Sequence, residues 1–227
     1  MYVGERTDLH YDNMVVMIVT AHPLVAAGRL RFADLVSQLD PGQLSTETLC
    51  AGWDVHMMTA HLVLPFEVTF ARFALTALRH GGDTARTVDD VTRRIARRPL
   101  ADLIAELRAQ AQAHVVPRRV GPEAQLVETA VHLRDVARPL GLDADVPPEH
   151  WRAVLEYLVS PGVAPAVLPG GRLAGLGLRA TDLPWTFGEG AKVVGTSEAI
   201  AMALTGRLAA LRDLDGPGVA LLGRRLA

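Results

Sequence analysis

Apolar residues recur every three or four positions through the N-terminal part of the chain, which is the spacing of amphipathic helices. This pattern predicts a first helix over Pro23–Leu39. Asp54 is a suitable cap for a second helix that runs to about Arg79. Inside it, Pro65 has no amide hydrogen to offer the carbonyl group of His61, so we expect a kink centred on that histidine.

Two further helical regions complete an expected four-helix bundle. The third covers roughly Val88 to Val115 with a break near Arg98-Pro99, and the fourth runs from Pro122 to about Arg138. Because short loops join the four regions, we expect them to pack as neighbours in one bundle. The bundle domain would span residues 21–142, preceded by an N-terminal extension over residues 1–20.

The pattern changes after a predicted linker at residues 143–148. Glycine and proline become frequent beyond Pro161, and short apolar runs replace the helical spacing. We expect a small α+β domain over residues 149–227, and therefore an α+β fold class for the chain. Its predicted elements are a helix at 149–159, strands at 172–179, 185–187 and 191–194, a helix at 198–211 capped by Ser197, and a last strand at 219–222.

Composition and charge narrow the class of protein. The 227 residues are 49% hydrophobic, 21% charged and 5% aromatic, which is ordinary for a globular protein and excludes disordered and fibrous classes. The 23 basic and 25 acidic residues give a net charge of -2, so no overall field attracts nucleic acid or an anionic membrane. A local cluster of arginines on the third helical region has no interleaved aromatic residues, and we interpret it as a solvated face: Arg93, Arg94, Arg97 and Arg98.

Location and source follow from a few residues. The lone cysteine, Cys50, excludes an intrachain disulfide and suits a reducing compartment, so we expect a cytoplasmic protein. The apolar stretch Met14–Thr20 is too short to span a bilayer and follows acidic residues, so neither a membrane anchor nor a signal peptide is expected. Lys192 is the only lysine beside 22 arginines, a bias that indicates a high-GC, actinobacterial source.

Candidate chemistry begins with Glu128 and His132, which lie four residues apart and share one face of the fourth predicted helix. A carboxylate and an imidazole at this spacing can bind one divalent ion together, and Asp135 continues the same stripe. A third ligand would have to come from elsewhere. The same pattern fits an amphipathic helix with a polar face in water, because apolar residues follow the opposite side: Leu126, Ala130, Leu133 and Ala137.

A second segment of interest surrounds His61, which falls in mid-helix among apolar neighbours, where a lone histidine is usually structural. Two groups of residues together resemble the mycothiol-dependent maleylpyruvate isomerase family of the DinB-like superfamily. The first is Trp53, Val55 and Ala60-His61-Leu62; the second is Glu128, His132, Asp135 and the following Arg138-Pro139-Leu140-Gly141. The resemblance continues into the C-terminal part at residues 201–207 and 215–219.

The resemblance implies a DinB-like bundle that holds a divalent metal ion through His61, Glu128 and His132. Asp135 would orient His132 or a neighbouring arginine. Zinc is the metal expected for two imidazoles and a carboxylate, although nickel, cobalt and iron fit the same ligands. Three protein ligands leave a position for a thiolate or a substrate oxygen, as in a catalytic metal site.

The family's activity implies mycothiol as a cosubstrate and a small electrophilic acid as the substrate, undergoing isomerisation or S-transfer. It also implies a catalytic arginine near the C-terminus, because a guanidinium group can bind both oxygens of a carboxylate. Arg224 and Arg225 are the candidates. We expect Arg207 to tie the two domains together instead of contacting the substrate.

Two other functions stay open at this point. The family usually carries an aspartate where this chain has Met57, which makes a thiol-independent metal-dependent hydrolase or lyase of secondary metabolism conceivable. The second open function is that of a non-catalytic protein that binds a small ligand. In that case His61, Glu128 and His132 would serve only as buried polar groups with satisfied hydrogen bonds. Cys50 has no base marked beside it, and we expect it to be a packed small residue. His114 is a substitute ligand if one of the three is wrong.

Overall fold

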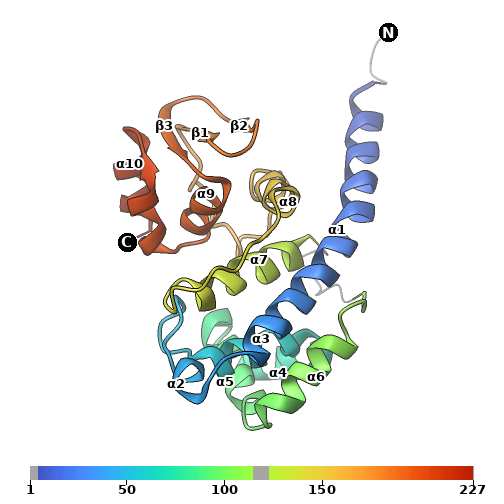
Figure 1. Ribbon diagram of the computed structural model, residues 1–227. Coiled ribbons are helices and arrows are strands. Elements are labelled where there is room, and N and C mark those ends of the chain that lie inside the picture. Colours follow the sequence, from blue (N-terminus) through green and yellow to red (C-terminus); the bar gives the residue numbers. More distant parts are fainter. Residues whose placement is uncertain (1–4, 115–122, 227) are drawn as a thin grey trace.

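Helices dominate the computed structural model of the protein, which describes residues 5–114 and 123–226 and, in the first helix, the side chains from Ala21 onward (Figure 1). Val115 and Pro122, the predicted end of the third helical region and start of the fourth helix, lie outside the described residues, but the last helix of the third region already ends at Ala109. The helices of the larger, N-terminal part are α1 (Glu5–Ser37), α2 (Pro41–Leu44), α3 (Val55–Glu67), α4 (Phe70–Arg79), α5 (Thr84–Ile95), α6 (Leu100–Ala109), α7 (Ala124–Ala137) and α8 (Pro148–Leu158).

Helix α7 is the centre of the bundle, because α1, α3 and α8 all pack against it. Helix α6 closes the bundle by packing against α1 and α3, and α5 lies on α3. The approach of α1 to α7 is closest at Gly28, where an added Cβ would lie 2.6 Å from the Thr129 hydroxyl oxygen. Glycine at this position therefore sets the spacing of the two helices.

Two of the predicted helix limits are wrong. The predicted second helix is two helices, because α3 ends two residues after Pro65 and Val68 is extended. Thr69 then starts α4 by accepting a hydrogen bond from the backbone N–H of Arg72. The first helix begins at Glu5, not at Pro23, so residues 5–20 are a helical continuation of α1.

The C-terminal part is a small four-stranded sheet with helices beside it. Strands β1 (Leu176–Ala180) and β3 (Ala191–Gly195) pair in parallel at its centre, and β2 (Thr186–Phe187) and β4 (Leu214–Asp215) pair antiparallel at its edges. Helix α9 (Ser197–Leu204), a 3-10 helix at Leu208–Asp213 and helix α10 (Gly218–Arg224) complete it. The α+β fold class is confirmed.

Three predictions in this part need correction. The cap of α9 is Thr196, whose hydroxyl accepts from the N–H of Ala199, and not Ser197. The helix ends at Leu204 instead of residue 211, because Gly206 has a positive φ of 98° that breaks it. The predicted last strand at 219–222 is helix α10, whose Leu222 is fully buried against the sheet domain; the last strand is β4, five residues earlier.

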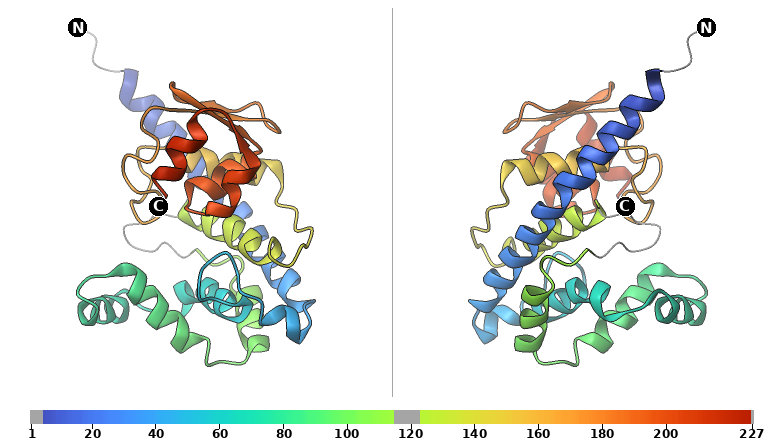
Figure 2. Two further views of the ribbon diagram at one scale, coloured as in Figure 1. Left: turned by 90° about the vertical axis from the view of Figure 1, so that its left-hand side faces the viewer. Right: turned by 90° about the vertical axis from the view of Figure 1, so that its right-hand side faces the viewer.

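The two parts share one continuous apolar core, in which α9 packs on β1 and β3 and also on α8 (Figure 2). Helix α8 packs against both α7 and α9. Residues 143–147 of the predicted linker have no regular secondary structure and Pro148 begins α8, yet Ala144 and Val146 are buried. A division of the chain into domains at residues 143–148 stays a prediction.

Within residues 5–114 and 123–226, no helix combines the length and the apolar character needed to cross a membrane.

Candidate metal centre

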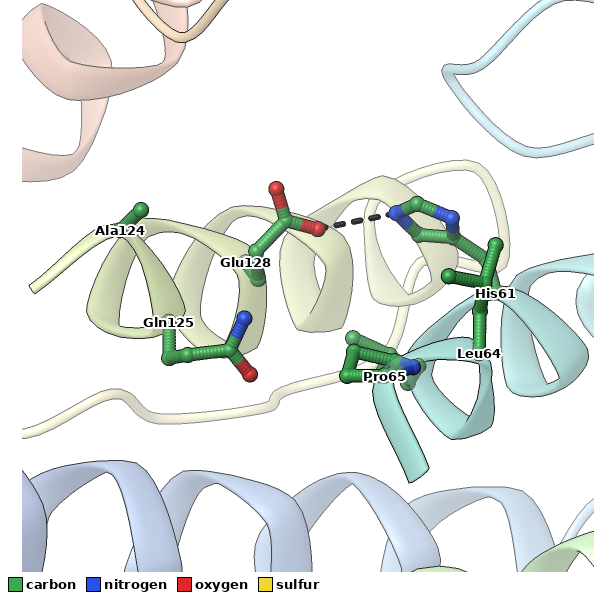
Figure 3. A pocket seen from close by; sticks show the side chains of 7 residues that line it. His61, Leu64, Pro65, Ala124, Gln125 and Glu128 are labelled. Carbon is green, nitrogen blue, oxygen red and sulfur yellow. Dashed lines mark hydrogen bonds and ion pairs between the residues drawn. The ribbon is translucent and has the colours of Figure 1, made fainter. Parts of the chain in front are cut away.

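The three predicted ligands come together where α3 meets α7. His61 Nε2 lies 2.9 Å from Glu128 Oε2, and His132 Nε2 lies 3.1 Å from the same oxygen. Figure 3 shows His61 and Glu128 facing each other across the gap between the two helices. The rings of His61 and His132 meet edge to face, with centroids 5.0 Å apart. Sequence spacing alone placed two of these groups together, and the fold adds the third.

Local structure fixes the position of His61. Asp54 caps α3 by accepting a hydrogen bond of 2.8 Å from the backbone N–H of Met57. An acid at position 57 is therefore not needed to start the helix. The indole of Trp53 lies 5.0 Å from the His61 ring and donates from Nε1 to Asp89. The tryptophan thus packs on the side of the histidine and is itself held by a carboxylate.

Helix α7 is buried on nearly every side, so the interpretation of a polar face in water is wrong. Twelve of its fourteen residues are buried, including Asp135, which has no exposed surface. Helix α8 packs on α7, and the C-terminal part reaches α7 through ion pairs such as that of Arg207 with Asp135. A stripe of ionisable groups in this setting needs partners, because a buried unpaired charge is costly.

Asp135 is the hub of a second set of contacts behind His132. Its Oδ2 lies 2.8 Å from His132 Nδ1, and Arg207 binds both of its oxygens from the C-terminal part. Burial raises the pKa of Asp135, but the hydrogen bond from His132 and the charge of Arg207 outweigh this and lower the pKa to about 2. Asp135 is therefore a charged, buried group.

Cys50 is partly buried and packs against the apolar core, as expected, and its thiol also lies beside this pair. Its sulfur lies 3.4 Å from Asp135 Oδ2 and 3.4 Å from Arg207 Nη2. The thiol is thus next to a carboxylate that also contacts His132. This neighbourhood could not be predicted from the sequence pattern, because Cys50 and Arg207 are 157 residues apart.

The charges of the two central groups support each other. Partial burial of Glu128 favours its neutral form, yet the hydrogen bonds from His132 and His61 keep its pKa well below the ordinary value. Burial lowers the pKa of His132, but the bonds to Asp135, Cys50 and Glu128 raise it well above normal. An anionic carboxylate thus faces two imidazoles. A divalent cation bound between them would take the place of the hydrogen bonds that join these groups.

The residues fit a divalent metal ion. Two imidazole nitrogens and a carboxylate oxygen, all within 4.8 Å of one another, are a donor set that zinc and related ions prefer. Asp135 holds the far nitrogen of His132, as carboxylates do behind metal-bound histidines. Nε2 is the nitrogen of His61 that faces the other two candidate ligands, whereas Nδ1 is buried and has no hydrogen-bond partner within the described residues.

A small cavity of about 130 Å³ opens beside His61 and Glu128. Its wall is mostly apolar, with one amide: Leu62, Leu64, Pro65, Ala124 and Gln125 complete the lining (Figure 3). This volume suits a small molecule. The sequence did not single out Gln125, because one polar residue on a helix carries no signal of burial.

The two predicted catalytic arginines lie elsewhere. Arg225 donates to the backbone carbonyl oxygens of Arg172 and Ala174, which ties α10 to the loop before β1. Arg224 is exposed. Neither has a recorded contact with the three ligand candidates in the described part of the chain, whereas Arg207 reaches Asp135. The role of Arg224 and Arg225 stays a prediction.

The other candidates are explained by ordinary contacts. Arg93 and Arg94 pair with Asp89 and Asp90 one turn earlier, as expected of a solvated helix face. His114 stacks on His22, with ring centroids 3.3 Å apart, and is not among the grouped ligand candidates.

The helical bundle with facing histidine and glutamate side chains and the appended α+β unit agree with the DinB-like fold that the resemblance implied. The family model of the mycothiol maleylpyruvate isomerase N-terminal domain matches residues 25–123, a range that includes His61 but not Glu128 or His132. No curated protein matches the chain in sequence.

Two solved structures share the fold. A histidine-to-alanine variant of the mycothiol-dependent maleylpyruvate isomerase matches with a TM-score of 0.57 at 16% identity, over 87% of this chain and 92% of that one. A second structure of the mycothiol-dependent maleylpyruvate isomerase matches with a TM-score of 0.54 at 17% identity, over 83% and 88%. The likeness thus extends beyond the matched domain into the C-terminal part.

Proposed function

We propose that the protein is a metal-dependent enzyme that uses a low-molecular-weight thiol, mycothiol, to isomerise a small unsaturated acid or to transfer the thiol to it. The proposal rests on the convergence of His61 and His132 on one oxygen of Glu128 beside a cavity. The family match and the shared fold make a maleylpyruvate-like acid the first substrate to test.

The chain's own residues would do three things. Glu128, His61 and His132 would hold the ion, which when bound supplies Lewis acidity and lowers the pKa of a thiol. Asp135 accepts from Nδ1 of His132 and so leaves Nε2 free to act as a ligand. Arg207 keeps Asp135 charged and joins the C-terminal part to the site.

In this chemistry the thiolate sulfur adds to one carbon of the conjugated double bond, and the electron pair moves onto the carbonyl group. The former double bond is then a single bond, and rotation about it changes the geometry. Return of the electron pair restores the double bond and expels the thiolate, so the thiol is regenerated. The apolar wall from Leu62, Leu64 and Pro65 would exclude water from the reacting carbons.

A non-catalytic binding protein is the weaker explanation. His61, Glu128 and His132 lie together beside a cavity, and a family model of an isomerase domain matches residues 25–123. Both observations favour catalysis.

The test is turnover of maleylpyruvate by zinc-loaded protein with and without mycothiol. We expect turnover only when the thiol is present, and loss of turnover in His61→Ala. His56→Ala is the matched control, because His56 lies on the same helix and contacts the Arg98 carbonyl group instead of the cluster. Equal turnover without any thiol would reject the proposal in favour of the hydrolase or lyase alternative.

A further inference from the structure

Arg29 of α1 carries a buried charge with no acidic partner in the described part of the chain. Its side chain is 2% exposed, and Nη1 donates to the backbone carbonyl oxygens of Gln110, Ala111 and Ala113 after the end of α6. The guanidinium also lies over the ring of Phe66. Burial lowers the pKa of Arg29 to about 10, so the group is still charged at neutral pH.

The remaining recorded contact of Arg29 points toward the metal centre. Its Nη2 lies 3.2 Å from Oε1 of Gln125 on α7. Because a guanidinium group only donates hydrogen bonds, the glutamine must present its oxygen to Arg29. The amide nitrogen is then turned to the other side, and Figure 3 shows it directed toward Glu128.

The amide nitrogen of Gln125 is a donor with no hydrogen-bond acceptor among the described residues. The residue is 8% exposed, lines the cavity, and donates no recorded side-chain hydrogen bond within the described residues. Its neighbours in the cavity wall are apolar, apart from His61 and Glu128, which already bind each other. A buried donor aimed into a cavity calls for an acceptor on whatever occupies that cavity.

We propose that Gln125 is a specificity-determining residue that donates a hydrogen bond to an anionic oxygen of the substrate, and that Arg29 is the positioning residue that fixes its orientation. The inference rests on the proposed function and names the group that recognises the acid. An anion suits the place better than a neutral oxygen, because Arg29 contributes an unpaired positive charge behind the amide.

The sharpest variant is Gln125→Glu, because it keeps an acceptor for Arg29 and removes the hydrogen-bond donor that faces the cavity. A glutamate accepts from Arg29 and forms an ion pair with it, so we expect the thermal midpoint to stay equal or rise. Its second oxygen would face the cavity as an anion instead of a donor. We expect maleate to bind about 10- to 100-fold more weakly, measured by calorimetry at full zinc occupancy.

Three comparisons make the result specific. The neutral diamide of maleic acid should bind the wild-type and Gln125→Glu proteins with affinities within about 3-fold of each other, because it carries no charge to repel. Gln125→Met, which lacks both donor and acceptor, should weaken maleate binding about 10-fold and also lower the thermal midpoint. Gln38→Glu, the same change of charge at an exposed position, should alter neither quantity.

The inference and the proposed function fail in different ways. Maleate affinity that is unchanged in Gln125→Glu, or absent in the zinc-loaded wild type, would overturn the role of Gln125 even if turnover requires a thiol. A loss of affinity explained wholly by loss of zinc would overturn it as well. If maleate binding depends on Gln125 but turnover needs no thiol, the carboxylate site stands and the thiol mechanism falls.

Discussion

His150 makes the stability of the fold depend on pH in a way that can be worked out from its surroundings. The side chain is 1% exposed, and its Nε2 lies 3.2 Å from the carbonyl oxygen of Leu126, at the contact of α8 with α7. Burial lowers the pKa of His150 to about 4, against an ordinary value of 6.5, and the bond to Leu126 only partly opposes this. The folded chain therefore holds this histidine neutral at pH 5, where the unfolded chain protonates it.

The direction of the pH dependence of stability follows from the lowered pKa of His150. The unfolded state binds the extra proton, so His150 has no effect on stability above about pH 6.5 and lowers the free energy of unfolding progressively as the pH falls toward 4. Each unit of the shift corresponds to about 1.4 kcal/mol. The loss from this one group is about 2 kcal/mol at pH 5 and about 3 kcal/mol once the pH is below 4.

The assay is urea unfolding of the wild type and His150→Gln at pH 7 and pH 5, followed by circular dichroism. Glutamine removes the titrating group, so we expect the drop in free energy of unfolding between the two pH values to be about 2 kcal/mol smaller in the variant. His56→Gln, at a partly exposed position, is the matched control and should keep the wild-type drop. Identical pH dependence in wild type and His150→Gln would refute the reasoning.

Three further predictions concern packing and the contacts behind the metal centre. Gly28→Ala should lower the free energy of unfolding by about 1–2 kcal/mol in urea titrations, because the new methyl group overlaps Thr129 by more than the gain in helix propensity offsets; a stabilised variant would contradict the close packing of α1 on α7. Arg207→Met leaves Asp135 buried without its cation and should cost about 3–5 kcal/mol at pH 7, and the double variant with Asp135→Asn should recover part of that loss. Cys50→Ser should keep thiol-dependent turnover within about 3-fold, since the nucleophile is external; complete loss of turnover would make Cys50 the reacting sulfur.

Hydrophobic spacing was enough to predict the central elements of the fold. Helices α7 and α8 and strand β3 lie close to where the pattern put them, because each has a regular apolar face or run, whereas β1 begins at Leu176, four residues later than predicted. The failures occur where a local contact overrides the pattern. Thr69 starts a new helix although the apolar spacing continues through it, and Gly218 allows α10 to approach β3 where a strand had been expected.

The candidate site also has one part that the sequence pattern predicts and another part that it does not. Glu128 and His132 follow from helix spacing, whereas His61 joined them only through a family resemblance, since nothing in the spacing relates residues 67 positions apart. The pairing of Asp135 with Arg207 and the burial of Arg29 against Gln125 were not predictable, because polar residues on a helix look solvent-facing until another element covers them.

The central claim is that His61, Glu128 and His132 hold one divalent ion. The most direct measurement is elemental analysis of the purified protein after incubation with zinc and removal of free metal, alongside His61→Ala, Glu128→Gln and His132→Ala. We expect about one ion per chain in the wild type and in the control His150→Gln, and little or none in the three ligand variants, each with its helical circular dichroism retained. Full zinc content in His132→Ala, or a wild type that binds no divalent ion, would contradict the account.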